Sequence, residues 1–293
     1  MVVGRAQTRL VSVALLLSMS ALACLQVTKS PQFRRNVSTS ARMIRIDDLV
    51  KYHVPLGEGS KEAEFLRHWT GYDPSLTVEV GYLRDTRDIV SRADQKNCTQ
   101  ALEVLAWLMH EMQSKKLLLV LAYGELIHFH RERDFVESTT GRYLDDDIDL
   151  WAYPDAVMDV IRRESDMIKS FGWTARVFVH GDYIIFLQLT AVCGHTPKGE
   201  IAKAESQEPG IELYPLSRFQ FNGTSFLKDL WQDARFPETM ISPPVLSSMV
   251  SSAFSGMLRV QLPNKASEVM TCIYGDWKSF SSKHAAGGER CGV

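Results

Sequence analysis

A crowded acidic run leads directly into an apolar segment between residues 145 and 151. The acids are Asp145, Asp146, Asp147 and Asp149, and the apolar residues are Ile148, Leu150 and Trp151. A solvated loop would not continue into residues of this kind, so the acids lie at the edge of a buried element. Because side chains alternate along a strand, we expect Asp145, Asp147 and Asp149 to share one face. Asp146 is then expected to point away from them.

Carboxylates on one face repel one another unless a cation lies between them. Hard divalent cations take oxygen ligands, commonly one or two carboxylates together with phosphate oxygens of a substrate. The pattern therefore predicts a metal site with Asp147 and Asp149 as ligands, Mg²⁺ or Mn²⁺ as the ion, and phosphoryl transfer as the chemistry. Asp145 is either a third ligand or a base for an acceptor hydroxyl. A solvated strand end, with Asp145 as a loop acid, is the alternative.

The residues around this run predict a mixed α+β domain. Hydrophobic periodicity predicts a helix over 99–115, a buried strand over 117–123, a short helix over 125–133 and, after the acidic strand, a helix over about 155–170. Strands at 175–180 and 183–189 flank a Gly181-Asp182 turn signal. Residues 193–210 are predicted as a loop and the last third as irregular. The order indicates a small mixed sheet flanked by helices.

The N-terminus has the pattern of a secretory leader. Arg5 and Arg9 precede an apolar run over residues 10–27, and Ala21 and Ala23 fit a small-residue cleavage site. The run is also nearly long enough to remain as a membrane anchor. We therefore expect a signal peptide or signal anchor at 1–28, a stem or linker at 29–45, an N-terminal extension at 46–98 and one main domain at 99–285.

Two further features fit the secretory route. Asn36, Asn97 and Asn222 each begin an Asn-X-Ser/Thr glycosylation acceptor. The cysteines beyond the leader are Cys98, Cys193, Cys272 and Cys291. They allow two disulfides, or one disulfide with two buried thiols. The formal net charge of −2 gives no reason to expect binding to nucleic acid.

Three residues before the acidic run are candidates for binding a phosphate-bearing substrate. Gly124 follows the apolar strand at once and lets a backbone approach a phosphate, or else only turns the chain. Arg131 carries a planar guanidinium that suits phosphate oxygens, or else lies on a helix surface. Glu125 either adds a fourth acid to the metal site or repels phosphate.

Together these segments resemble the LicD and fukutin-related nucleotidyltransferase-like proteins. That family has Gly-Thr/Ser-x-Leu-Gly-x-x-Arg, a short link and Trp-Asp-x-Asp-hydrophobic-Asp; its counterpart here is GELIHFHR at 124–131, followed by LDDDID at 144–149. The family's later Pro, helix and Tyr-Gly-x-x-Trp correspond to Pro263 and to YGDW at 274–277. The match covers roughly residues 100–280. The resemblance implies a nucleotidyltransferase-like fold and metal-dependent transfer of a phospho-substituent from a CDP-linked donor.

The chain departs from the family pattern at several positions. Glu125 replaces the small hydroxyl residue, and His128 replaces the second glycine. The loop at 135–144 is longer than the usual link. A third carboxylate has no obvious counterpart, since the returning strand offers Gln188 where an acid would lie. These departures bear on catalysis more than on fold.

The sequence therefore supports three hypotheses. In the first, a Golgi enzyme, anchored as a single-pass type II protein or lumenal, moves a phospho-alditol or phosphocholine-type group from a CDP donor to a glycan. If the leader is cleaved, such a protein is secreted. In the second, a catalytically idle relative binds glycan or a partner glycosyltransferase. In the third, a secreted interaction protein carries a chance acidic strand.

Overall fold

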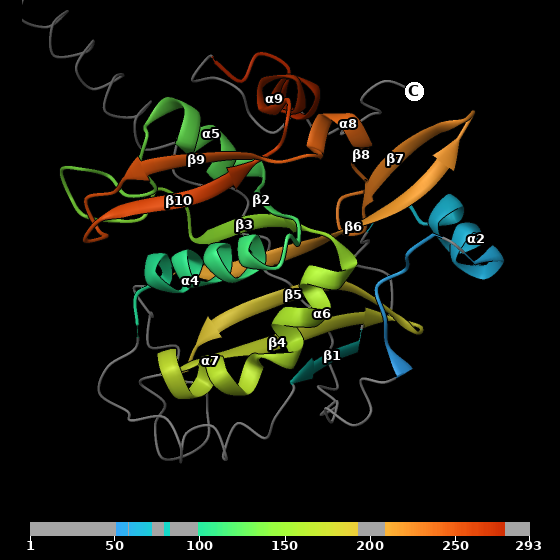
Figure 1. Ribbon diagram of the computed structural model, residues 1–293, viewed down its shortest axis with the longest axis horizontal. Coiled ribbons are helices and arrows are strands. Elements are labelled where there is room, and N and C mark those ends of the chain that lie inside the picture. Colours follow the sequence, from blue (N-terminus) through green and yellow to red (C-terminus); the bar gives the residue numbers. More distant parts are fainter. Residues whose placement is uncertain (1–50, 58, 72–78, 83–98, 193–208, 279–293) are drawn as a thin grey trace, which may run out of the picture. The chain divides into compact units, whose positions relative to one another are not determined.

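The computed structural model describes residues 51–57, 59–71, 79–82, 99–192 and 209–278 (Figure 1). The expected leader and stem, the acceptors at Asn36 and Asn97, and three of the four body cysteines lie outside these ranges. Cys272 is disulfide-bonded, so at least one of the expected disulfides forms. Among the described residues, no helix has the length and apolar character needed to cross a membrane.

One mixed sheet organises the fold. Its strands lie in the order β1 (Glu79–Tyr82), β4 (Trp173–His180), β5 (Tyr183–Ala191), β6 (Gly210–Phe221), β3 (Asp147–Ala152) and β2 (Leu119–Leu121). β3 and β6 run parallel, while the other neighbours are antiparallel. β6 is long, and its second half pairs with β7 (Thr224–Asp229), which pairs with β8 (Arg235–Pro237). A separate ribbon joins β9 (Val245–Val250) to β10 (Met257–Leu262).

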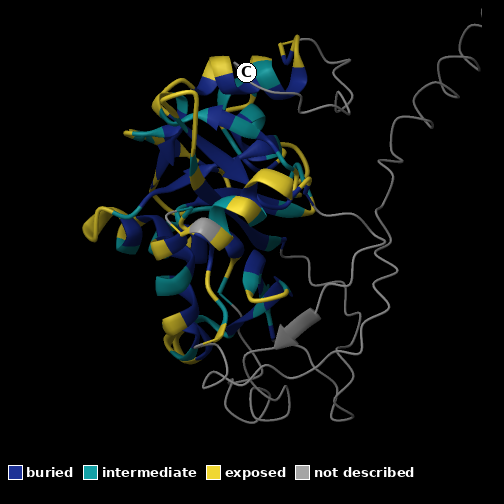
Figure 2. Cartoon of the chain, turned by 90° about the vertical axis from the view of Figure 1, so that its right-hand side faces the viewer, coloured by how far each residue is buried: buried dark blue, intermediate teal, exposed yellow. Residues whose placement is uncertain are grey.

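Helices flank this sheet, which confirms the predicted α+β class. They are α2 (Ser60–His68), α4 (Ala101–Ser114), α5 (Tyr123–Arg131), α6 (Pro154–Arg162), α7 (Glu164–Phe171), α8 (Glu238–Ile241) and α9 (Ala266–Tyr274). α4, α6 and α7 lie on the near side of the sheet in Figure 1. α4 buries Ala101, Leu105, Leu108 and Met112, which recur at helical spacing. Buried residues run through the strands, while exposed residues lie on the outer helices and turns (Figure 2).

The helix predicted over 155–170 is wrong as one element. It is two helices that meet at Arg163, where ψ is 3°. The side chain of Arg163 pairs with Glu111 of α4 at 2.8 Å and with Asp159 at 3.1 Å. The change of direction buries Glu164, which accepts a hydrogen bond from Thr174 Oγ1 at 2.8 Å. Neither Gly nor Pro marks this break, so periodicity alone could not find it.

The prediction of an irregular last third is also wrong, because residues 209–278 contain five strands and two helices. The β6–β7 hairpin turns at Asn222 and Gly223, whose φ angles are +49° and +76°. Positive φ at both central residues is the geometry that favours Asn-Gly in tight hairpins. The sequence signal was therefore present, but Asn222 was interpreted only as a glycosylation acceptor.

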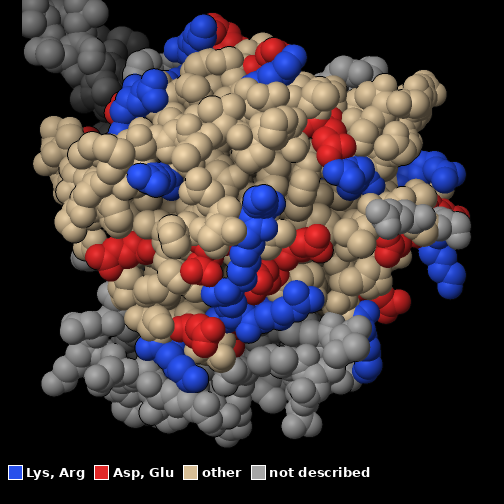
Figure 3. Space-filling model, in the orientation of Figure 1, with Lys and Arg blue, Asp and Glu red and all other residues tan. Residues whose placement is uncertain are grey.

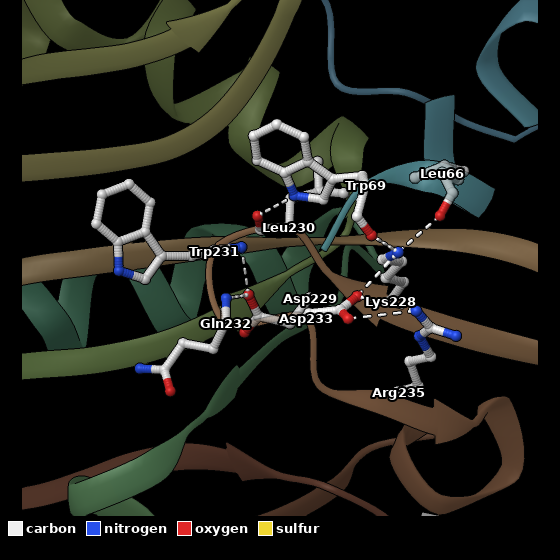
Figure 4. A network of polar contacts seen from close by, with 9 residues as sticks. All are labelled: Leu66, Trp69, Lys228, Asp229, Leu230, Trp231, Gln232, Asp233 and Arg235. Atoms are coloured by element: carbon white, nitrogen blue, oxygen red, sulfur yellow. Dashed lines mark hydrogen bonds and ion pairs between the residues drawn. The ribbon is translucent and has the colours of Figure 1, made fainter. Parts of the chain in front are cut away.

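A buried lysine fastens α2 to this part of the sheet (Figure 4). Lys228 Nζ donates hydrogen bonds to the carbonyl oxygens of Leu66, at 2.6 Å, and Trp69, and it pairs with Asp233 at 2.9 Å. The indole of Trp69 donates to the carbonyl of Leu230 at 2.5 Å. A cation at the end of a helix satisfies carbonyl groups that have no partner within the helix.

Charge is distributed without a region of one sign on the face that carries α4. Figure 3 shows acidic and basic side chains interspersed there. Some of them pair across elements, as Lys115 of α4 does with Asp159 of α6 at 2.7 Å. The described part of this face therefore has no basic region of the kind that binds a nucleic-acid backbone.

Candidate metal centre

Three carboxylates converge where β3 and β6 run side by side. Asp147 and Asp149 alternate along β3, and the parallel register sets Asp149 beside Glu212 of β6. One carboxylate oxygen from each of the three lies within 4.8 Å of the others. The expected sharing of a face by Asp147 and Asp149 agrees with the start of β3 at residue 147. This cluster can hold a metal ion.

Asp149 is the most constrained member of the cluster. Its backbone carbonyl accepts a hydrogen bond from Ala122 N at 2.9 Å, which extends the pairing of β2 with β3 by one residue. Its side chain is buried, and Oδ1 has no hydrogen-bond partner among the described residues. A buried carboxylate oxygen without a hydrogen-bond partner is costly, and a cation bound to this atom would offset that cost.

The side chain of Glu125 makes the hydrogen bond with β3 that follows the one made by the backbone of Ala122. Its carboxylate accepts a hydrogen bond from the backbone N–H of Asp149 at 2.8 Å, and its side chain is only 2% exposed. The chain leaves β2 before this position and begins α5, so no backbone carbonyl of β2 is available to the N–H group of Asp149. The carboxylate of Glu125 takes the place of that carbonyl. Glu125 therefore fixes the backbone of Asp149, a role that the sequence analysis did not foresee.

The third carboxylate is Glu212, which the sequence analysis missed. Glu212 follows a segment predicted as a loop, and no periodic pattern marked it as part of a strand. Gln188, examined as the place for an acid, lies opposite Glu212 on β5 and donates a hydrogen bond to its Oε1 at 2.7 Å. The hydroxyl of Tyr214 donates to Oε2, also at 2.7 Å. The expectation that the site lacks a third acid is therefore wrong. The acid is Glu212 on β6, and Gln188 on the neighbouring strand donates a hydrogen bond to it.

Asp145 and Asp146 precede β3, so the alternation expected for them does not apply. Asp145 lies against the start of α5, where a Cβ added to Gly124 would come 2.8 Å from Asp145 Oδ2. The lack of a side chain at Gly124 thus leaves space for the carboxylate of Asp145. The prediction that Asp146 points away is wrong, since one oxygen from each of Asp145, Asp146 and Asp147 lies within 4.8 Å of the others.

A buried aspartate and three aromatic rings lie next to the acids and hold the start of α5. Tyr123 has a φ of +38°, an unusual value for an aromatic residue. Its hydroxyl donates to Asp229 Oδ2 at 2.5 Å, and the indole of Trp151 donates to the same oxygen at 2.8 Å. The Tyr123 ring meets those of Trp151 and Tyr214 edge to face. These contacts fix the backbone immediately before Gly124.

Burial, together with repulsion between like charges, raises the pKa values of the acids in the centre. Burial, then Glu125, Asp147 and Glu212, raise the pKa of the Asp149 carboxyl well above its ordinary value. Burial and Asp145 do the same to the pKa of Glu125. Burial raises the pKa of Asp145 to about 6. A divalent cation would reverse this pattern, because it stabilises the ionised carboxylates.

The Tyr-Gly-x-x-Trp segment reaches this centre through α9. Burial raises the pKa of the Tyr274 hydroxyl, with further contributions from the charges of Asp149, Glu125 and Asp145. Tyr274 therefore lies in the field of the acids. Trp277 is a packing residue, since its ring meets that of His130 at 5.9 Å and its indole donates to Thr271 Oγ1 at 3.2 Å.

Arg131 lies at the opposite end of α5 from the acids. Glu125 is in the first turn and Arg131 in the last, a separation of about 9 Å along the axis at 1.5 Å per residue. The first turn of the helix thus presents Gly124 and Glu125 to the carboxylates.

The carboxylate set matches the oxygen ligands that hard cations prefer, and Asp149 Oδ1, which has no hydrogen-bond partner among the described residues, can serve as one of those ligands. A scan of the sequence against protein-family models gives no match, and a search of curated proteins finds no significant match.

Proposed function

We propose that this protein is a metal-dependent transferase of the LicD and fukutin-related type, with a nucleotidyltransferase-like fold. Its reaction moves a phospho-alditol or phosphocholine-type group from a CDP-linked donor to a glycan. The observation that carries the proposal is the convergence of Asp147, Asp149 and Glu212 around the unpartnered Asp149 Oδ1. The motif order from Gly124 to Trp277 supplies the donor class by resemblance.

In this scheme Asp147, Asp149 and Glu212 hold Mg²⁺ or Mn²⁺. When bound, the ion neutralises charge on the donor diphosphate and on the transferring phosphoryl group. Glu125 holds the Asp149 backbone in place through its 2.8 Å hydrogen bond. Asp145, beside Gly124 at the edge of the cluster, accepts the proton of the acceptor hydroxyl. The acceptor oxygen then bonds to the transferred phosphorus, and the bond from that phosphorus to CMP breaks.

The proposed location is the secretory pathway, in the Golgi. The basic and apolar N-terminus, as signal anchor or cleaved leader, and the Asn-X-Ser/Thr acceptors support this. Asn222 is exposed in the β6–β7 turn, where a glycan has room. The disulfide at Cys272 also fits an oxidising compartment.

A turnover assay tests the proposal. The purified full chain is incubated with CDP-choline or CDP-linked alditols and glycan acceptors. CMP release, which accompanies transfer of the phospho-group, is measured with Mn²⁺ and with EDTA. We expect release with Mn²⁺ that EDTA abolishes, and a loss of at least about 100-fold in Asp149→Asn, since the variant removes a metal ligand.

The assay also separates the competing functions. Metal binding without CMP release from any donor would favour the idle relative that binds glycan or a partner glycosyltransferase. A folded chain that binds neither Mn²⁺ nor Mg²⁺ would overturn the enzyme proposal and leave the secreted interaction protein.

A further inference from the structure

A row of four polar side chains crosses the sheet at the candidate metal centre. The strand register sets them side by side on β4, β5, β6 and β3, as Arg176, Gln188, Glu212 and Asp149. Side chains at opposite positions of neighbouring strands share a face and lie within contact distance. The metal-binding cluster occupies one end of this row, and a guanidinium occupies the other.

Gln188 connects the two ends through both atoms of its amide. Arg176 Nη1 donates a hydrogen bond to Gln188 Oε1 at 3.2 Å, and Gln188 Nε2 donates to Glu212 Oε1 at 2.7 Å. The guanidinium fixes which way the amide faces, because it can only donate. Gln188 therefore presents its N–H group to the carboxylate.

This arrangement orients Glu212 through two neutral donors. Gln188 holds Oε1 and the Tyr214 hydroxyl holds Oε2, so a neutral donor restrains each carboxylate oxygen. A direct ion pair between Arg176 and Glu212 would instead place a positive charge where a cation has to bind. The amide keeps that charge one side chain away from the carboxylate.

We propose that Gln188 is a positioning residue of the metal centre, which holds Glu212 in its ligating orientation and separates it from the Arg176 guanidinium. This inference rests on the proposed metal-dependent function. It gives Gln188, which lies where an acid was expected, a specific role in the metal centre. Partners that orient ligands in this way typically contribute 10–100-fold to metal affinity.

The test is a Mn²⁺ titration of the full chain, followed by the electron paramagnetic resonance signal of free Mn²⁺. Gln188→Met removes the amide at similar length, and Gln188→Asn keeps an amide that is too short to reach Glu212. Thr190→Val is the matched control, since Thr190 is the next residue on the same face of β5 and is also half-buried.

We expect the Kd for Mn²⁺ to rise about 10–100-fold in both Gln188 variants and to change less than about twofold in Thr190→Val. A role in folding alone would lower the unfolding temperature in EDTA and leave the Kd of the folded protein unchanged. If Gln188→Met does not fold, Gln188→Asn retains the polarity of the site and carries the test.

The outcomes separate this inference from the proposed function. If the wild-type chain binds Mn²⁺ and the Gln188 variants bind as tightly as Thr190→Val, the positioning role is wrong and the metal centre stands. If the wild-type chain binds no Mn²⁺, the metal centre and the role of Gln188 are both overturned.

Discussion

At the scale of single residues, Asp149 carries a conflict between stability and function. Its carboxyl is buried, its Oδ1 has no hydrogen-bond partner among the described residues, and Glu125, Asp147 and Glu212 all raise its pKa. Without a cation, such a group disfavours the folded state at any pH where it is ionised. With a cation it becomes a ligand. Sites that sacrifice stability in this way are commonly functional.

Asp149→Asn is therefore expected to stabilise the metal-free protein while abolishing metal binding. At pH 8 in EDTA, we expect the variant to unfold with a free energy about 1–3 kcal/mol higher than the wild-type chain, because it removes a buried charge. Added Mn²⁺ should stabilise only the wild-type chain. The measurement is urea unfolding, with the exposed turn residue variant Asp182→Asn as control. A metal-free variant less stable than the wild-type chain would contradict this account.

Asp145 gives a pH dependence of defined sign. Its folded-state pKa of about 6 lies above the unfolded value of about 3.9. Since the folded chain binds this proton more tightly, its contribution disfavours folding progressively as pH rises from about 4 through about 6. In EDTA, we therefore expect the free energy of unfolding of Asp145→Asn to increase relative to that of the wild-type chain as the pH rises from about 4 through about 6.

The difference between the two proteins is the informative quantity. Burial lowers the pKa values of His128 and His130. Both histidines are present in both chains, so their contributions cancel in the comparison. Thermal unfolding at several pH values between 4 and 8 measures the shift. A difference that is constant with pH would show that the Asp145 pKa is not raised in the folded state.

These residue-scale features were only partly predictable from the sequence. Strand alternation placed Asp147 and Asp149 on one face, because that argument needs only local geometry. Glu212 and Gln188 could not be assigned, since their proximity depends on the register of strands far apart in sequence. The role of Glu125 depends on where β2 ends, and strand ends are the least certain part of any sequence reading.

At the scale of elements, the start of α5 is held from outside the helix. Asp229, at the end of β7, accepts hydrogen bonds from the Tyr123 hydroxyl and the Trp151 indole through Oδ2. Its Oδ1 accepts from the backbone N–H groups of Trp231 and Gln232 at 2.7 and 3.0 Å (Figure 4). One carboxylate thus joins β7, β3 and α5.

Asp229→Asn should disrupt this junction. An amide has one acceptor oxygen, so either the backbone pair or the Tyr123 and Trp151 pair loses its acceptor, and an indole N–H cannot accept in return. We expect a loss of about 2–4 kcal/mol in the free energy of unfolding, measured in urea. The surface variant Asp182→Asn is expected to change stability by less than about 0.5 kcal/mol. Equal stability of the two variants would contradict the junction.

The helices and strands show which elements local sequence determines. α4 and the β4–β5 hairpin were predictable, because periodicity and a Gly181-Asp182 turn mark them. The end of α6 at Arg163 was not, since ion pairs to Glu111 and Asp159 accompany it rather than a helix-breaking residue. The β6–β7 hairpin carried a clear turn signal at Asn222 and Gly223 that went unused.

At the scale of the whole molecule, a segment outside the expected main domain joins the sheet. β1 pairs with β4, and α2 is fastened to β7 by the buried amine of Lys228. Sequence reasoning had no means to find these contacts, because Lys228 lies about 160 residues from its carbonyl partners Leu66 and Trp69.

Lys228→Met tests whether the attachment of α2 to β7 contributes only to stability or also to metal binding. The variant leaves the buried carbonyl groups of Leu66 and Trp69 without their cation, while Asp233 keeps its pair with Arg235. We therefore expect a loss of about 2–4 kcal/mol in the free energy of unfolding. The Kd for Mn²⁺ of the folded variant should stay within about twofold of the wild-type value. A large rise in that Kd would show that the α2 attachment also shapes the metal centre.

The central claim is that Asp147, Asp149 and Glu212 hold a divalent cation. The most direct test is to grow crystals of the full chain with Mn²⁺ and CDP and to measure anomalous diffraction at the manganese edge. We predict a peak about 2.1–2.3 Å from one oxygen of each of these three carboxylates. A peak located elsewhere, or no peak in crystals whose carboxylates are ordered, would contradict the account.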